Sequence, residues 1–294
     1  MMVEYELLQT KEFDQALNYL KEYERVKIIA GGTDILVDLH KDEIEDEEMD
    51  YILDISNIDQ LKKITIGEKY IELGSLVTHS TLIEDERLSE RYPVLAQAAE
   101  TIGSVQIRNR GTIGGNIINA SPAADLLPPL IALQAEIVVQ SRDGKRTLSI
   151  PEFITGPYQT DISPDELLTT IKIPIYEDKY YSNFQKIGRR QAVAIARLNT
   201  AVVARIDGEN KFSDTRIVPG SATPAPQAFK VVEKMVNGQK IDEVNFAEIG
   251  EQAAEEMVSI TGERWSTPYK KPALASLVER ALKGIVEEVI SDEQ

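Results

Sequence analysis

The sequence predicts an α+β fold with two domains, and three observations lead to this prediction. The chain has 294 residues, more than one average domain needs. Its first thirty residues contain an apolar run, a helical pattern and a second apolar run that leads into a Gly-Gly pair. Beyond residue 180, strand-like runs come first and helical patterns follow, the order typical of an α+β domain. We therefore expect domains at 1–176 and 177–294.

Strands of the first domain are predicted where short apolar runs are rich in β-branched or aromatic residues. They are expected at 3–8, 26–30, 51–55, 63–67, 70–74, 136–140, 145–150 and 167–173. The pair at 136–140 and 145–150 forms a hairpin around residues 142–144. Pro174 is expected to stop the last strand, because proline cannot donate a hydrogen bond to a neighbouring strand.

Three helices are predicted in the same domain. Thr10 can cap the first, because apolar residues recur at helical spacing over 13–20. The second begins at Pro93, since proline is favoured in a first helical turn, and reaches Ile102. The third covers 125–134 and tolerates its two prolines only near its first turns.

The second domain follows a predicted linker at 175–179. Alternating and β-branched runs predict an antiparallel sheet, and helical periodicity predicts three helices after it. The strands are expected at 181–187, 195–206 and 215–219, and the helices at 226–237, 246–260 and 273–290.

Composition narrows the class of protein. Hydrophobic residues make up 42% of the chain and charged residues 28%, and no apolar run approaches the ~20 residues that a membrane span needs. The first residues lack a basic segment followed by an apolar one, so the expected location is cytoplasmic. The net charge of −17 repels phosphates and argues against a nucleic-acid partner. The acidic run at 42–50 is either a solvated surface or a docking face for a basic subunit.

The absence of cysteine has a direct chemical consequence. With no cysteine in the chain, disulfides, cysteine-ligated zinc and cysteine-bound iron–sulfur clusters are excluded. The only histidines, His40 and His79, give no credible metal site, and we expect helix-capping or buried hydrogen-bonding roles for them. No catalytic residue and no metal ligand is predicted.

Two glycine-bearing segments, 30–34 (AGGTD) and 112–116 (TIGGN), are the clearest candidates for a binding site. Glycine permits positive φ and close backbone approach, and successive N–H groups in such turns can hold an anion. Neither segment is a Walker or Rossmann motif. Each taken alone is also compatible with an ordinary tight turn.

The longer strings around these segments carry a family resemblance. IIAGGTDILV, GSVQIRNRGTIGGN, TIGGNIINASPAADLLPPLIAL, ELLTTIKIP, FQKIGRR and SATPAP occur in this order over most of the chain. The chain thereby resembles the medium, FAD-carrying subunit of the molybdenum hydroxylases, the family of xanthine dehydrogenase and aerobic carbon monoxide dehydrogenase. The resemblance implies a vanillyl-alcohol-oxidase-type FAD-binding domain of two subdomains, followed by a C-terminal α+β domain that covers the flavin.

The resemblance also implies which residues bind FAD. In the first segment the N–H groups, with the Thr33 hydroxyl, are expected to hold the pyrophosphate, whereas the carboxylate of Asp34 would repel it and is expected to cap a helix or turn. In the second segment, Thr112 and two glycine amides are expected to reach the pyrophosphate or ribityl chain. The implied residues of the two segments are Ile28, Ile29, Ala30, Gly31, Gly32, Thr33, Asp34, Ile35, Thr112, Ile113, Gly114, Gly115 and Asn116.

Five further residues are implied outside the segments. Asp125 is expected to accept from a ribose or ribityl hydroxyl, or else to cap a helix at Leu126. Lys186 and Arg190 are expected near the flavin, where a cation favours reduction, and solvated surface positions are the alternative. The other two, Ile102 and Leu168, contact the adenine or flavin rings in the family or are simply core. The family's acidic residue after the Arg-Arg pair is missing in 191–196, which leaves the charges at the flavin edge open.

The function expected from the sequence is an FAD-binding electron-transfer subunit. Its partners would be a molybdopterin-binding large subunit and a [2Fe–2S] small subunit, and its acceptor NAD or another oxidant. One alternative is a stand-alone flavin reductase of the same fold superfamily, which would need its own proton donor at the flavin. The other is a non-catalytic binding module that does not take up FAD.

Overall fold

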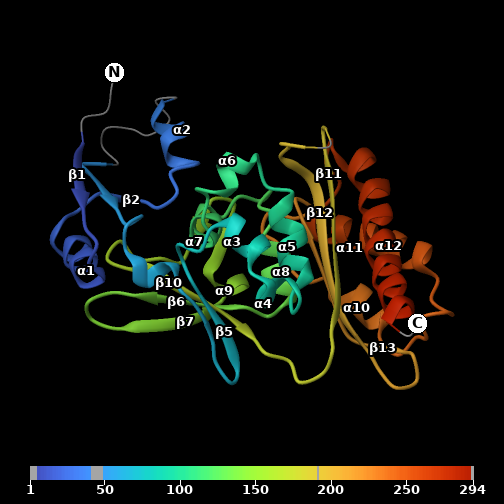
Figure 1. Cartoon of the computed structure of the whole chain (residues 1–294). Helices are drawn as coiled ribbons and strands as arrows, with labels where there is room; N and C mark the ends of the chain where they lie inside the picture. The colour runs from blue at the N-terminus through green and yellow to red at the C-terminus, as the bar shows by residue number, and fades with distance from the viewer. Residues whose placement is uncertain (1–4, 41–48, 191, 293–294) are drawn as a thin grey trace.

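The computed structural model in Figure 1 describes residues 5–40, 49–190 and 192–292. Along the chain, a small sheet at the N-terminus is followed by a larger sheet with a group of short helices, and then by a third sheet backed by long helices. No helix in the described ranges combines the length and the apolar character that a membrane crossing requires.

The first sheet is parallel and has the order β1-β3-β2. Its strands are β1 (Glu6–Gln9), β2 (Val26–Ile29) and β3 (Tyr51–Asp54), and α1 (Phe13–Glu22) connects the first two. The buried face of α1 is the predicted one, with Ala16, Leu17 and Leu20 in the core. Residues 3 and 4 of the predicted first strand, and 42–48 of the acidic run, lie outside the described residues.

Thr10 does not cap α1, so that prediction is wrong. The residue before the helix is Glu12, and its side chain makes no capping bond. The Thr10 hydroxyl instead accepts from the Glu12 N–H at 3.0 Å, which closes a turn ahead of the helix. The Thr10 hydroxyl, two residues before the capping position, therefore organises the approach to the helix.

The second sheet is antiparallel, with the order β4-β5-β10-β6-β7. Its strands are β4 (Ile64–Ile66), β5 (Tyr70–Gly74), β6 (Glu136–Gln140), β7 (Lys145–Ser149) and β10 (Leu167–Pro174). Shorter elements near it are η2 (Asp59–Lys62), α9 (Ile150–Phe153), β8 (Ile154–Gly156) and β9 (Gln159–Thr160). The predicted hairpin is confirmed, and Pro174 pairs with Tyr70 as the last residue of its strand.

Six short helices lie between the second and third sheets (Figure 1). They are α3 (His79–Glu84), α4 (Glu86–Ser89), α5 (Pro93–Glu100), α6 (Val105–Arg108), α7 (Ile113–Asn119) and α8 (Leu127–Ala132). The predictions of α5 and α8 are confirmed, with Pro128 and Pro129 in the first turn of α8. The other four helices were not predicted, because four to seven residues are too few to show a clear helical period.

The third sheet is antiparallel and contains β11 (Tyr181–Gly188), β12 (Ala196–Ile206) and β13 (Phe212–Gly220). The helices α10 (Lys230–Val236), α11 (Phe246–Thr261) and α12 (Thr267–Asp292) follow it. All three strands and all three helices were predicted. The last helix begins six residues before its predicted start and runs through Pro272. Burial of the helix face that carries Leu274 and Leu277 outweighs the one backbone hydrogen bond that proline cannot donate.

The hydrophobic core does not divide at the segment between β10 and β11. Residues 175–180 contain no helix or strand. One buried cluster nevertheless joins α5 and α8 to Phe184, Ala201, Val203 and Val218 of the third sheet. The opposite face of that sheet packs on α10 and α12, which in turn contact α11, in a separate cluster. The third sheet is therefore fixed against the central helices, and residues from both halves of the chain can share a site.

Candidate functional site

The first glycine segment joins the end of β2 to α2 (Ile35–His40). Gly32 has φ +78°, a conformation that residues with a side chain rarely adopt. At Gly31 a Cβ atom would lie 2.0 Å from the backbone oxygen of Arg110, which no side chain could tolerate. Glycine is therefore required at both positions, once for backbone conformation and once for close approach of two chain segments.

The backbone donors of this segment have no acceptor within the described part of the chain. The N–H groups of residues 30–34 make no intrachain hydrogen bond there, whereas those of Leu36 and Val37 donate back to Gly32 and Asp34. The Asp34 carboxylate accepts from the Thr33 hydroxyl at 3.2 Å and from the Asn119 amide at 3.1 Å. The carboxylate is thus held by its own partners, and the free donors remain available to an anion.

The second glycine segment is the start of α7. Thr112 caps this helix by accepting from the Gly115 N–H at 3.0 Å. The Gly114 N–H donates to the backbone carbonyl oxygen of Ser75 at 2.9 Å. The Cβ of a larger residue at 114 would lie 2.6 Å from that carbonyl oxygen. The two amides that were expected to face the cofactor therefore have intrachain acceptors in this structure.

Two buried polar atoms next to this helix have no partner in the described residues. They are Oγ of Ser75 and Oδ1 of Asn116. Such atoms are rare in folded proteins, because an unsatisfied buried polar group costs about 1–3 kcal/mol. Their position beside the glycine segments fits a ligand that offers hydroxyl or amide donors.

The two glycine segments lie against each other. Gly31 approaches the backbone of Arg110 and Gly111, immediately before Thr112. Asn119 at the end of α7 bonds to Asp34 at the start of α2. The sequence resemblance assigned both segments to FAD binding, and the structure brings their backbones into contact.

His79 lies behind the second segment. Burial, and then the charge of Arg108, lower the pKa of His79 to about 4. The backbone N–H of His79 donates to the carbonyl oxygen of Gly111. The ring nitrogen Nδ1 of His79 has no partner among the described residues. His40, in contrast, is exposed at the end of α2 with Nδ1 2.5 Å from the Leu36 oxygen, as expected for a residue at a helix end.

A buried ion pair lies between α8 and the third sheet. Nζ of Lys186 is 2.6 Å from Oδ2 of Asp125, and the two side chains are only 9% and 8% exposed. Lys186 also donates to the Thr101 carbonyl and approaches its hydroxyl, at 3.0 and 3.4 Å. Asn199 donates to the other Asp125 oxygen at 2.8 Å. Burial raises the pKa of Asp125, and Lys186 and Asn199 oppose that rise.

Two of the alternatives weighed from the sequence are wrong. Asp125 does not cap a helix, because Leu126 occupies the capping position of α8 and no side chain caps it. Lys186 is not a solvated surface residue. Thr101 and Asn199 were missed as partners of this pair; the signal for Asn199 was a polar residue within the apolar run of β12.

The remaining predicted residues are dispersed. Arg190 is exposed, and its Nε donates to the carbonyls of Ala192 and Val193 at 3.1 and 2.9 Å. Leu168 is 3% exposed and belongs to the central core, and Ile102 packs on the edge of the same core. Their expected contacts with cofactor rings stay predictions.

The donors and acceptors of the site define what it can bind. Unpaired N–H groups suit phosphate oxygens, and orphaned polar atoms suit hydroxyl groups. The close approach at Gly31 leaves no room for a side chain between the two segments. These features fit a dinucleotide. Within the described residues, no group of three acidic or histidine side chains could hold a metal ion.

Comparisons with known families agree with this chemistry. Residues 3–176 match the family described as "FAD binding domain in molybdopterin dehydrogenase". Residues 183–285 match the "CO dehydrogenase flavoprotein C-terminal domain". Together the two matches account for most of the chain.

Individual relatives are similar over nearly their whole length. The glyceraldehyde dehydrogenase medium chain of Sulfolobus acidocaldarius is 28% identical, over 96% of this chain and 98% of its own. The xanthine dehydrogenase FAD-binding subunit of Escherichia coli is 29% identical over 92% of each chain. The solved carbon monoxide dehydrogenase of Hydrogenophaga pseudoflava contains a chain with TM-score 0.88 and 26% identity, covering 98% of this chain and 99% of that one.

Proposed function

Because this chain belongs to the FAD-binding subunits of the molybdopterin dehydrogenases, we propose that it is the electron outlet of a molybdenum hydroxylase. It is the FAD-binding component of an oxidoreductase. In the proposed role, it receives electrons from iron–sulfur clusters on a partner chain and delivers them to NAD or another acceptor.

The free N–H groups of the first glycine segment are the observation that carries the proposal. They lie at the end of β2 beside the start of α7, and they have no acceptor in the described chain. We assign the pyrophosphate of FAD to residues 30–34. The Asn116 and Ser75 oxygens would accept from hydroxyl groups of the same ligand.

The isoalloxazine of FAD supplies the redox chemistry when it is bound, and the chain supplies position and charge. We assign Asp125 and Lys186 to the flavin side of the site, as the sequence resemblance implies. Since they neutralise each other, Lys186 acts on the flavin as half of a dipole and not as a free cation. We assign the exclusion of water to the third sheet, which packs on α8 within the same buried cluster as the second sheet.

The partners follow from what the chain lacks and from what its relatives are called. With no cysteine, it cannot hold its own [2Fe–2S] relay. Its relatives include proteins described as a medium chain or as a subunit of a dehydrogenase complex. We therefore propose a molybdopterin-binding large subunit and a [2Fe–2S] small subunit as partners. The domain division at residue 176 and the cytoplasmic location stay predictions.

Anaerobic reduction tests the proposed route. The FAD-loaded chain is titrated with NADH while the flavin absorption near 450 nm is followed, a wavelength of the order typical of oxidised flavins. Bleaching is expected if NAD is the physiological acceptor. The lone chain should not hydroxylate xanthine, nicotinate or glyceraldehyde. Hydroxylation by the lone chain would favour a self-sufficient flavin enzyme, and failure to take up FAD would favour a binding module.

A further inference from the structure

We propose that Arg216 and Tyr176 form a clamp that positions α8 and, through it, the Asp125 end of the FAD site. The inference rests on the proposed function, because it assigns to two residues outside the glycine segments a role in FAD binding. Neither residue touches the segments; both act through a helix that carries Asp125 ahead of its first turn.

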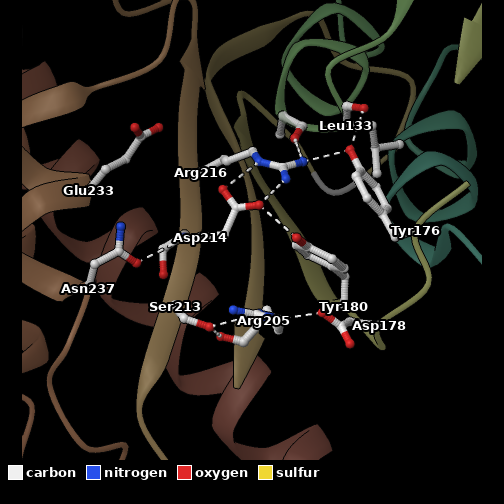
Figure 2. Close-up of polar contacts among 12 residues, drawn as sticks. Leu133, Tyr176, Asp178, Tyr180, Arg205, Ser213, Asp214, Arg216, Glu233 and Asn237 are labelled. Atoms are coloured by element: carbon white, nitrogen blue, oxygen red, sulfur yellow. Dashed lines mark hydrogen bonds and ion pairs between the residues drawn. The ribbon is translucent and has the colours of Figure 1, made fainter. Parts of the chain in front are cut away.

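The clamp closes on the C-terminal end of α8 (Figure 2). From β13, Nη1 of Arg216 donates to the Ala132 carbonyl at 3.1 Å and to the Tyr176 hydroxyl at 2.6 Å. The Tyr176 hydroxyl in turn donates to the Leu133 carbonyl at 2.7 Å. The last carbonyls of a helix have no acceptor role within it, so these two bonds satisfy groups that would otherwise be unpaired.

The guanidinium is itself held in place. Nε of Arg216 donates to Oδ1 of Asp214 at 3.2 Å, and a second bond from Nη2 reaches Oδ2. The Tyr180 hydroxyl donates to the same carboxylate at 2.6 Å. Arg216 is 5% exposed and lies 5.0 and 5.1 Å from the ring centres of Tyr176 and Tyr180. Because the Arg216 guanidinium is held by these contacts, it restricts the position of the C-terminal end of α8, to which it donates at Ala132.

The other end of α8 is held by the same sheet. Asp125, two residues before the helix, bonds to Lys186 of β11 and Asn199 of β12. Every residue of α8 is buried, and two prolines stiffen its first turn. Since a closely packed short helix moves as a unit, displacement at Ala132 is transmitted to Asp125. The third sheet therefore makes hydrogen bonds at both ends of α8, to Asp125 at its start and to Ala132 at its end.

Two conservative variants test the clamp. Tyr176→Phe removes the bonds to Arg216 and Leu133 but keeps the ring, which also lines a cavity of about 340 Å³. Arg216→Lys keeps the positive charge. A lysine ammonium lacks the planar guanidinium geometry with which Arg216 donates to Asp214, Ala132 and Tyr176 together. Tyr180→Phe is an intermediate variant, because its hydroxyl bonds only Asp214 and affects Arg216 through that carboxylate without reaching α8. Ile249→Val, in the separate core of α11, controls for general loss of stability.

The measurements are the Kd for FAD, the visible spectrum of the bound flavin and hydrogen exchange of the chain without FAD. We expect Tyr176→Phe and Arg216→Lys to raise the Kd about fivefold, the factor that one lost hydrogen bond provides. A shifted flavin spectrum and faster exchange of amides in 126–135 should accompany this. Tyr180→Phe should raise the Kd less than the two clamp variants do, and Ile249→Val should leave Kd and spectrum unchanged even where the Tm falls.

The outcomes separate the clamp from the proposed function. If the wild-type chain binds FAD and both clamp variants keep its Kd and spectrum, the clamp is wrong and the two residues only stabilise the fold. Exchange that accelerates at 130–135 but not at Leu126 and Leu127 would also overturn it, because α8 would not transmit the displacement. A wild-type chain that binds no FAD overturns the proposed function, and the clamp's role in FAD binding with it.

Discussion

Nζ of Lys186 lies 2.6 Å from Oδ2 of Asp125, so that a buried ion pair joins the third sheet to the start of α8. The ammonium also contacts both oxygens of Thr101. With three partners for three donors, Lys186 is fully occupied by the chain itself. This pair connects the two halves of the chain where the flavin side of the site is proposed.

Removal of the Lys186 charge should destabilise the fold. Lys186→Met leaves the Asp125 carboxylate buried without its cation, and breaking such a pair costs about 3–5 kcal/mol. The double variant Lys186→Met/Asp125→Asn should recover a large part of this loss, because no uncompensated charge remains. Urea unfolding of both variants and of Asp125→Asn measures the coupling. Equal stability of Lys186→Met and wild type would show that the pair is solvated.

His79 should make the stability depend on pH. Its pKa falls from 6.5 to about 4 on folding, so the unfolded chain binds a proton more readily between these values. The resulting stabilisation is present above about pH 6.5 and is lost as the pH falls toward about 4, with a total of about 3 kcal/mol. His79→Gln removes the titrating group.

The comparison is made by urea unfolding of wild type and His79→Gln at about pH 7 and about pH 4.5. The wild type should lose more stability between the two conditions than the variant does. Parallel losses in both proteins would mean that carboxylates alone govern the acid sensitivity.

Thr112 should be needed as a helix cap. Its hydroxyl accepts from the Gly115 N–H, and loss of such a cap costs about 1 kcal/mol. Thr112→Ala should therefore lower the free energy of unfolding by this amount, and Thr112→Ser should restore most of it. Thermal and urea unfolding of the two variants decide the matter; equal destabilisation by both would point to the lost methyl group in the core.

The sequence was informative where a pattern was long. Helix α11 lies where apolar spacing places it, because 16 residues of helical period leave one consistent face buried. Strands β5 and β6 have five residues each, and their short apolar runs were sufficient to locate them. The helices α6 and α7 were missed, since each is too short for a period and the first turn of α7 contains a Gly-Gly pair that is typical of a turn.

The candidate site was only partly visible in the sequence. Residues 30–34 could be identified, because their glycines mark a backbone conformation that is encoded locally. The intrachain acceptor of the Gly114 N–H could not be identified, since Ser75 comes from a distant part of the chain. The burial of Lys186 depends on packing between the third sheet and the central helices, and residue type alone does not determine it.

Substitution of Gly31 tests the central claim, that the first glycine segment binds FAD. In Gly31→Ala, the new Cβ would lie 2.0 Å from the Arg110 backbone oxygen, so the segment must move away from the second one. Gly144→Ala is the matched control, because it lies in a hairpin and its Cβ would meet no atom within 4 Å.

The decisive measurement is the Kd for FAD of wild type, Gly31→Ala and Gly144→Ala, obtained by flavin fluorescence titration of the apoproteins. We expect wild type and Gly144→Ala to bind one FAD with equal affinity. Gly31→Ala should bind at least about tenfold more weakly, which corresponds to about 1.4 kcal/mol. A folded Gly31→Ala variant with wild-type affinity would contradict the assignment of this segment to FAD.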